Sequence, residues 1–365
     1  MTDHRGDYFG AGPAALPIPV IHQLQQDILA YGSCGLSVLE ISHRSREFAG
    51  LLEAAKDSLR RLLKLPETHE VLFLQGGASH QFAMLPLNYL CSGRTAAYLI
   101  TGSWSEKAYE EAARVGDARI GYTNRANGFR SIEPPTGDVE TATDVYVHIT
   151  SNNTIVGSQW KTFPDFKAPL VADMSSDILS RAVDVTRFQM IYAGAQKNLG
   201  VAGVTLVIAR RDWLEASDPV DHLPKYLHYA THLKANSLYN TPPVFAIAAT
   251  RRVLEWVERE GGVPELERRN RHKASLVYAA IEESGGFYEG IVAPSVRSDM
   301  NATFRLQSTE LEQAFLEEAA AAGFRGLAGH RSVGGCRASL YNAVPVAAVE
   351  RLTTFMHEFR RRRQG

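Results

Sequence analysis

The chain has 365 residues, more than the roughly 150 to 200 of one ordinary domain, which predicts a large domain with a smaller partner. Hydrophobic residues make up 45% and charged residues 22%, a composition that excludes a disordered or fibrous chain. The formal net charge of −1 excludes a global field that would hold the protein on nucleic acid or an anionic membrane, so we expect neither as a partner.

The three cysteines, Cys34, Cys91 and Cys336, are widely spaced and form no CxxC pair. This argues against a disulfide framework and against a metal site of the zinc type, so we expect no metal. The first ten residues carry charges and no apolar run of signal-peptide length, and no window approaches the ~18 apolar residues of a membrane span. We therefore expect a cytoplasmic enzyme.

Short apolar runs recur through the middle of the chain, with helical patterns between and around them. The runs predicted as strands are Glu70–Leu74, Ala96–Thr101, Val145–Ile149, Pro169–Asp173, Met190–Ala193 and Thr205–Ala209. The patterns predicted as helices are Glu47–Leu63, Ser105–Val115 and Pro243–Glu258. This alternation predicts an α/β fold with a mostly parallel, doubly wound sheet.

The pattern changes near Gly261. A long charged amphipathic helix is followed by two short strands and a further helix, which we place at Pro264–Glu283, Ala302–Leu306, Arg337–Tyr341 and Glu310–Ala322. We predict a large domain over residues 17–260 and a smaller α+β domain formed by residues 1–16 and 261–365, with limits placed to within several residues.

A lysine stands where an apolar strand gives way to a turn of small residues, Gly194–Gly200. An ammonium at the end of a buried strand is costly unless it is paired or neutralised, and a partly desolvated lysine with a lowered pKa suits a Schiff-base nucleophile. Lys197 is therefore a candidate catalytic residue. On this segment alone, a surface-loop lysine is the alternative.

Asp173 ends another predicted strand upstream of this lysine. A strand-end aspartate is often only a helix cap. Beside Lys197 it has a second interpretation, because pyridoxal phosphate needs a lysine for its imine and an acid that keeps its pyridine nitrogen protonated. The pair predicts a pyridoxal-phosphate site.

Two adjacent glycines, Gly76 and Gly77, follow the first predicted strand and open a helical pattern at Ala78–His80. Backbone N–H groups at a helix N-terminus bind phosphate without a side-chain charge. Two glycines alone more often form a simple turn, but their position between a strand and a helix favours a phosphate cradle.

Together with motifs along the whole chain, these residues resemble the class V, fold-type I aminotransferases and, among them, the phosphoserine aminotransferase family. The motifs are GPAALP, SVLEISHRSREF, GGASHQF, ADMSSDILSR, YAGAQKNLG, YNTPP and GHRSVGGCRASLYNA. Any one of them is weak, whereas their combination is highly specific. The resemblance implies the fold of the type I pyridoxal-phosphate-dependent transferases.

The resemblance also implies pyridoxal 5'-phosphate as the cofactor. By position, Lys197 would form the imine and Asp173 would pair with the pyridine nitrogen. The other implied contacts are Ala78, Ser79 and Gln196 at the phosphate, Trp104 on the ring, Thr154 near the phenolic oxygen, and Asn240 and Thr241 from a second subunit. The last two imply a homodimer with shared active sites.

For the substrate, Arg337 matches the family's clamp on the α-carboxylate, where a planar bidentate fork suits a carboxylate better than lysine would. His43, Arg44, His330 and Arg331 match its pocket for the substrate phosphate. Each has a plainer interpretation, a solvated surface arginine or a satisfied histidine. The repeated His-Arg pair favours the phosphate pocket.

Two departures from the family pattern stand out. Ser79 occupies a place where some members carry an arginine, and Val201 and Cys336 also differ from the residues expected there. Cys336 raises the alternative of a cysteine desulfurase, which shares the fold and cofactor and uses a cysteine nucleophile. Against this, Cys336 stands in a strand-like stretch and not on a free loop.

The implied reaction moves an amino group between L-glutamate and 3-phosphohydroxypyruvate to give O-phospho-L-serine and 2-oxoglutarate, with Lys197 as imine former and general base. One alternative is another class V enzyme, such as a serine– or alanine–glyoxylate aminotransferase, which would not need two His-Arg pairs. A catalytically silent binding protein is the other, and the presence of Lys197 and Asp173 argues against it. The sequence leaves open whether 4-phosphohydroxy-L-threonine, of pyridoxine biosynthesis, is also a substrate.

Overall fold

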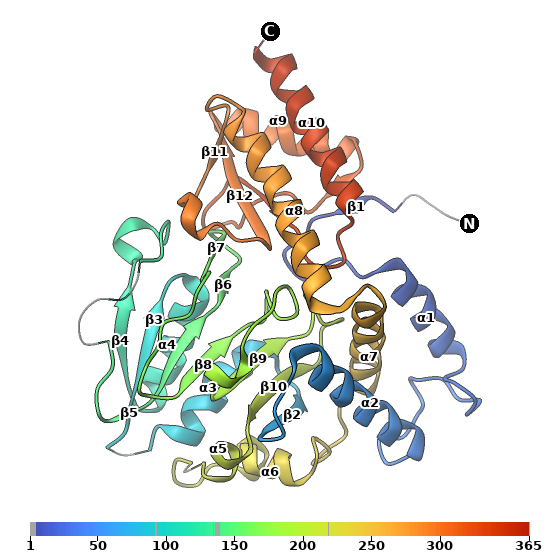
Figure 1. Cartoon of the computed structure of the whole chain (residues 1–365), viewed down its shortest axis with the longest axis vertical. Helices are drawn as coiled ribbons and strands as arrows, with labels where there is room; N and C mark the ends of the chain where they lie inside the picture. Colours follow the sequence, from blue (N-terminus) through green and yellow to red (C-terminus); the bar gives the residue numbers. More distant parts are fainter. Residues whose placement is uncertain (1–4, 92, 134, 136–138, 218, 365) are drawn as a thin grey trace.

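The computed structural model describes residues 5–91, 93–133, 135, 139–217 and 219–364. Its largest element is a seven-stranded sheet with the order β2-β10-β9-β8-β5-β3-β4 (Figure 1). Neighbouring strands are parallel, except that β10 runs antiparallel to both β2 and β9. The predicted mostly parallel sheet is therefore confirmed. Its strands are β2 (His69–Leu74), β3 (Thr95–Ile100), β4 (Asp117–Thr123), β5 (Asp144–Thr150), β8 (Leu170–Asp173), β9 (Met190–Gly194) and β10 (Thr205–Arg210).

Helices cover both faces of this sheet, because its strands are apolar on both sides and neither face can be left to water. Along each strand, successive side chains enter two different hydrophobic cores, as in the pair Leu72 and Phe73. One core is closed by α2 (Arg46–Leu63) and α7 (Val244–Arg259). The other is closed by α3 (Gly77–Tyr89), α4 (Ser103–Val115), α5 (Arg211–Glu215) and α6 (Tyr229–Lys234).

A second, smaller sheet with its own core lies above the first in Figure 1. It contains the antiparallel strands β11 (Tyr288–Gly290), β12 (Asn301–Leu306) and β14 (Cys336–Ser339). Its helices are α8 (Gly262–Glu282), α9 (Thr309–Ala321) and α10 (Val346–Gln364).

The N-terminal segment reaches this smaller part of the fold. Strand β1 (Asp7–Tyr8) pairs in parallel with β13 (Phe324–Arg325), and Phe9 packs in the smaller core. Helix α1 (Ile18–Leu29) then packs on α7 of the larger part. The segment between them therefore runs from one part of the fold to the other. The exact domain limits stay a prediction.

Most predicted elements occur within one or two residues of their expected bounds, but several were not predicted. The unpredicted β4 lies at the edge of the sheet, and its residues are all half-buried or exposed, so it lacks a continuous apolar run. The hairpin β6 (Asn152–Asn153) and β7 (Ser158–Gln159) is polar and short. Helices α1 and α10 were also missed. Within the described residues, every helix is too short or too polar to span a membrane.

A buried ion pair holds α1 on α7. The carboxylate of Asp27, a residue that is 1% exposed, accepts two hydrogen bonds of 2.7 Å from the guanidinium of Arg252. Removing one member of such a pair leaves the other charge poorly compensated.

We therefore expect Asp27→Asn to lower the free energy of unfolding by about 2 kcal/mol, which calorimetry will record as a melting temperature lower by several degrees. The matched control is Asp165→Asn, because the Asp165 side chain is 94% exposed in its ion pair with Arg187 and such pairs contribute little. Equal melting temperatures for the two variants would contradict the role assigned to the Asp27 pair.

Candidate active site

The carboxyl ends of the central strands, the start of α3, the N-terminal segment and β14 surround a cavity of about 500 Å³. The structure brings nine of the predicted site residues to this one cavity, namely Ala78, Ser79, Trp104, Thr154, Asp173, Gln196, Lys197, His330 and Arg337. These residues come from segments spread over most of the chain. Their convergence marks the cavity as the candidate active site.

Lys197 lies in the turn that follows β9, half-buried against the N-terminal segment. A Cβ atom added to Gly12 would lie 3.6 Å from Lys197 Cε, and Ala14 N–H donates to the Gln196 carbonyl at 2.8 Å. Burial lowers the pKa of the Lys197 ammonium, and the nearby carboxylates of Asp173 and Asp177 act in the opposite direction. A lysine with a lowered pKa is a better amine nucleophile near neutral pH.

Asp173 is the last residue of β8, and it is 5% exposed. Burial raises the pKa of its carboxyl group, while hydrogen bonds from Ser175 and the charge of Lys197 oppose that rise. The Ser175 N–H donates to Asp173 Oδ1 at 2.9 Å, and the Ser175 hydroxyl donates to the same atom at 2.6 Å. The carboxylate is therefore held in one orientation at the cavity wall.

Ser175 also joins the two strands that carry the lysine and the aspartate. Its hydroxyl oxygen accepts a 3.1 Å hydrogen bond from the N–H of Gly194, the last residue of β9. We did not predict this role. The signal was present, because a serine two residues after an aspartate is a common turn partner, but only the fold shows that it reaches β9.

The glycine loop lies between β2 and α3 as predicted. Gly76 has φ +90°, and a Cβ there would lie 2.4 Å from the Cβ of His80, so only glycine fits. Helix α3 begins at Gly77, and the first N–H groups of a helix have no partner within it. Because Gly77, Ala78 and Ser79 line the cavity, this helix start can bind an anion there.

Arg337 approaches the cavity from β14 with unused hydrogen-bond donors. Its Nη1 donates to the Thr154 carbonyl at 2.8 Å, and Trp104 Nε1 donates to the Thr154 hydroxyl at 3.1 Å. Its buried Nε has no hydrogen-bond partner, and among the described residues no carboxylate forms an ion pair with it. Burial lowers the pKa of the guanidinium. An anionic ligand would relieve this unpaired buried group.

His330 lines the cavity beside this arginine. Its Nδ1 accepts a hydrogen bond from Ser332 N–H at 3.2 Å and lies 2.7 Å from the Ser332 hydroxyl, which leaves Nε2 as the donor of the neutral ring. Burial and the neighbouring charges of Arg337, Arg331 and Lys107 lower the pKa of His330.

The remaining predicted residues do not line this cavity within the single chain. His43 is half-buried, and the other four, Arg44, Asn240, Thr241 and Arg331, are exposed. Asn240 and Thr241 were expected to act from a second subunit, which agrees with their exposure. Gln75 Nε2 donates to the Thr241 carbonyl at 3.1 Å, so this turn is fixed beside the glycine loop.

Cys336 is fully buried on β14, and burial raises the pKa of its thiol. A buried thiol with a raised pKa is a poor nucleophile. The desulfurase alternative therefore finds no support in the structure.

Residues 8–352 match the aminotransferase class-V family. The chain belongs to this family. It is 55% identical over 355 residues to the phosphoserine aminotransferase of Geobacillus kaustophilus, with 97% of this chain and 98% of the relative covered. The solved phosphoserine aminotransferase of Bacillus circulans subsp. alkalophilus has a TM-score of 0.95 at 48% identity, covering 99% of this chain and 100% of the relative.

The PLP-bound phosphoserine aminotransferase of Trichomonas vaginalis has a TM-score of 0.91 at 35% identity, covering 97% of this chain and 100% of the relative. These similarities confirm the predicted family and the type I transferase fold.

We predict that Ser175→Ala will move the acid limb of the transaminase pH–rate profile to higher pH by about one unit. The substitution removes one of the hydrogen bonds that oppose the raised pKa of Asp173, so the carboxylate takes up its proton at higher pH. Ser175→Thr, which keeps a hydroxyl, should retain the wild-type limb. Ser180→Ala is the control, because this buried serine donates to Asp177 O and does not line the cavity. An unmoved acid limb in Ser175→Ala would contradict this role.

Proposed function

We propose that the chain is a phosphoserine aminotransferase that uses pyridoxal 5'-phosphate to move an amino group between L-glutamate and 3-phosphohydroxypyruvate. The observation that carries the proposal is the meeting of Lys197, Asp173, the start of α3 and Arg337 at one cavity. The names of the similar proteins support the choice of substrate. The decisive assay supplies O-phospho-L-serine and 2-oxoglutarate beside serine and alanine, and equal rates with serine would overturn the proposal.

The described residues fit the cofactor. Lys197 would hold its aldehyde carbon, Asp173 its pyridine nitrogen, and the N–H groups at the start of α3 its phosphate. When bound, pyridoxal phosphate supplies an aldehyde that combines with amines and a ring that takes up electrons from the α-carbon. Ser79 adds no charge to the cradle, so the backbone and the helix dipole would carry that phosphate.

Each residue then has a distinct task in the reaction. The lowered pKa of Lys197 favours its neutral amine, which would move the α-proton of the substrate once released. Asp173 would stay ionised beside a ring cation, because an opposite charge favours a carboxylate against the cost of burial. Ser175 would keep that carboxylate oriented while Lys197 moves.

Arg337 would bind the α-carboxylate that both amino-acid substrates share. Its buried Nε lacks a partner, and two parallel N–H donors match the two oxygens of a carboxylate. His330 would lie beside the substrate as a donor. The distal phosphate would then meet Arg331 and the pair His43 and Arg44.

We also propose that the enzyme is a homodimer in which His43, Arg44, Asn240 and Thr241 serve the partner's cavity. Exposed large apolar side chains adjoin these segments in sequence, including Leu36 at 51%, Leu39 at 61% and Tyr239 at 47% exposure. A homodimer would cover these side chains, because exposed apolar groups that gather into one patch mark protein interfaces. The expected cytoplasmic location and acceptance of 4-phosphohydroxy-L-threonine stay predictions, the latter tested by the same assay.

Lys197→Ala should abolish transamination and the absorbance of the lysine-bound cofactor, because none of the other residues that line the cavity is a lysine. Lys161→Ala is the matched control. Burial also lowers the pKa of Lys161, but this lysine donates to Gln159 and Asp299 away from the cavity. Turnover of Lys197→Ala within about tenfold of wild type would contradict the assignment.

Arg44→Ala and Arg331→Ala should each reduce kcat/KM for O-phosphoserine by about 10- to 150-fold, the equivalent of a lost charge-assisted hydrogen bond, and affect glutamate much less. Arg337→Ala should affect both substrates alike. Measuring the two half-reactions of each variant tests this directly. Equal losses for the two substrates in Arg44→Ala and Arg331→Ala would show that these arginines do not bind the phosphate.

Mixing subunits tests whether Arg44 acts across an interface. A dimer of one Lys197→Ala chain and one Arg44→Ala chain has one cavity with both residues intact if Arg44 serves the partner. Co-refolded mixtures should then regain wild-type KM for O-phosphoserine at those cavities. If Arg44 serves its own chain, the mixture will keep only the weakened KM of the Arg44→Ala parent.

A further inference from the structure

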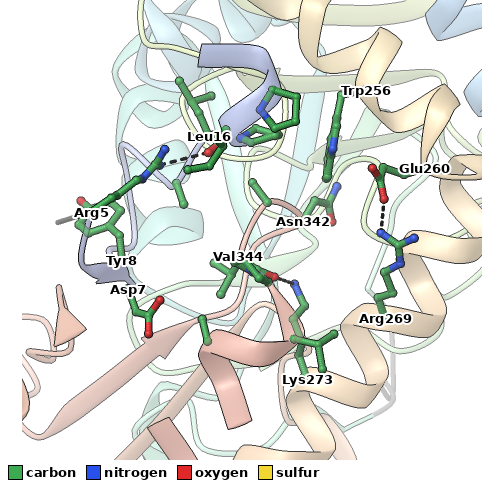
Figure 2. Close-up of a pocket in the computed structure, with 18 of the residues that line it drawn as sticks. Arg5, Asp7, Tyr8, Leu16, Trp256, Glu260, Arg269, Lys273, Asn342 and Val344 are labelled. Carbon is green, nitrogen blue, oxygen red and sulfur yellow. Dashed lines mark hydrogen bonds and ion pairs between the residues drawn. The ribbon is translucent and has the colours of Figure 1, made fainter. Parts of the chain in front are cut away.

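A second cavity, of about 530 Å³, also borders the N-terminal segment (Figure 2). It is enclosed by α7, α8, the segment 5–19 and the loop that leads into α10. It shares no lining residue with the candidate active site among the described residues. Its walls are largely apolar and include Leu16, Pro17, Pro19, Trp256 and Val344.

Some charged side chains around this cavity form ion pairs, and others do not. Asp7 accepts two hydrogen bonds, of 2.8 and 2.7 Å, from Arg351, and Glu260 is paired with Arg269. Arg5 donates to the Leu16 carbonyl at 3.1 Å and forms no ion pair with the described residues. With Lys273 included, the described lining therefore has three basic side chains, Arg5, Arg269 and Lys273, against two acidic ones, Asp7 and Glu260.

Lys273 adds a buried cation at the floor of this cavity, where Figure 2 shows it directed toward Val344. It is 1% exposed, and its ammonium donates to the carbonyls of Leu340 and Tyr341 at 2.8 Å and of Val344 at 3.1 Å. These carbonyls satisfy all three N–H donors but supply no full negative charge. Burial and the charge of Arg269 lower the pKa of Lys273 to about 7. A nearby anion would compensate this charge.

We propose that this cavity is an effector site for a small organic monocarboxylate with an apolar body. A volume of this size with apolar walls and a few polar groups is typical of small-molecule sites. The apolar body of the ligand would lie against Trp256, Pro17 and Pro19. Its carboxylate would face Arg5, and the positive charge of Lys273 would attract it electrostatically. An amide of the same shape lacks the charge, and an amine carries the wrong one.

The same N-terminal segment lines both this cavity and the candidate active site. Ala11, Gly12 and Pro13 line the catalytic cavity, whereas Ala15 and the residues directly after it line the second one. A narrow void between the two cavities is lined by Leu16 and Trp256 on one side and by Lys197 and Asn198 on the other.

The loop between β14 and α10 also links the second cavity to the active site. The carbonyls that bind Lys273 follow directly after β14, the strand that carries Arg337, and Asn342 N–H donates to Asn198 Oδ1 at 3.0 Å. A ligand that fixes these segments would alter the surroundings of Lys197 and Arg337. Coupling of this kind is reciprocal, so cavity occupancy and substrate affinity should affect each other.

The test uses the holoenzyme and three probes with the same aromatic ring, phenylacetate, phenylacetamide and benzyltrimethylammonium, a cation that cannot form an imine with the cofactor, titrated by calorimetry in saturating 2-oxoglutarate. That keto acid occupies the carboxylate site of the catalytic cavity without turnover. We expect phenylacetate to bind once per chain, phenylacetamide at least about fivefold more weakly, and benzyltrimethylammonium not at all. Equal binding of phenylacetate and phenylacetamide, or no saturable binding below about 10 mM phenylacetate, would overturn the proposal.

Variants then locate the site. Arg5→Gln should weaken phenylacetate binding about fivefold, and Val346→Trp should block it by filling the cavity, with kcat within about twofold of wild type in both. The matched control is Arg361→Gln, an exposed arginine of α10 away from the cavity, which should bind normally. Unchanged binding in both Arg5→Gln and Val346→Trp would place phenylacetate elsewhere. Because binding is measured without turnover, this result is independent of the transaminase assays.

Discussion

The candidate active site depends on two ionisable groups, Lys197 and Asp173, that lie at the ends of adjacent parallel strands and line the same cavity. Burial shifts the pKa of each group toward its neutral form, and each opposes that shift in the other. The register that pairs Asp173 with Tyr192 sets their approach, and Ser175 ties the two strand ends together. A sheet covered on both faces makes this register rigid, because a slip by one residue would exchange its two cores.

The N-terminal segment is the second constraint. It joins the smaller part of the fold through the pairing of β1 with β13 and then crosses behind Lys197, where a Cβ atom on Gly12 would be in van der Waals contact with the lysine. Tyr341 donates to the Ala11 carbonyl at 2.8 Å, so this crossing is fixed from the loop that follows β14. Motion of the smaller sheet relative to the larger one would therefore change the positions of Arg337 and of the groups around Lys197 together.

Sequence patterns predicted the sheet and the charged pair because buried parallel strands are continuous apolar runs, and because charges at their ends are rare enough to be informative. They did not predict β4, whose half-exposed side chains give no such run. Ser175 was missed because its partner in β9 is distant in sequence. The antiparallel direction of β10 could not be predicted either, because strand order and direction depend on contacts between segments distant in sequence. If Arg44 and Asn240 act in the cavity of a second subunit, the structure of a single chain does not show their contacts.

The charges at the cavity explain why an anionic cofactor and a substrate with a carboxylate would be preferred. Among the described residues that line it, the basic side chains are Lys197, Arg337 and His330, the helix start at Gly77 adds backbone donors, and Asp173 is the only carboxylate. The cationic neighbour of Asp173 is Lys197, and among the described residues Asp173 forms no ion pair with Arg337. The cavity therefore carries an excess of unpaired donors, which a cofactor phosphate and a substrate carboxylate would satisfy. Any further discrimination must come from groups outside this lining, and the proposed phosphate pocket would place the exposed Arg331 among them.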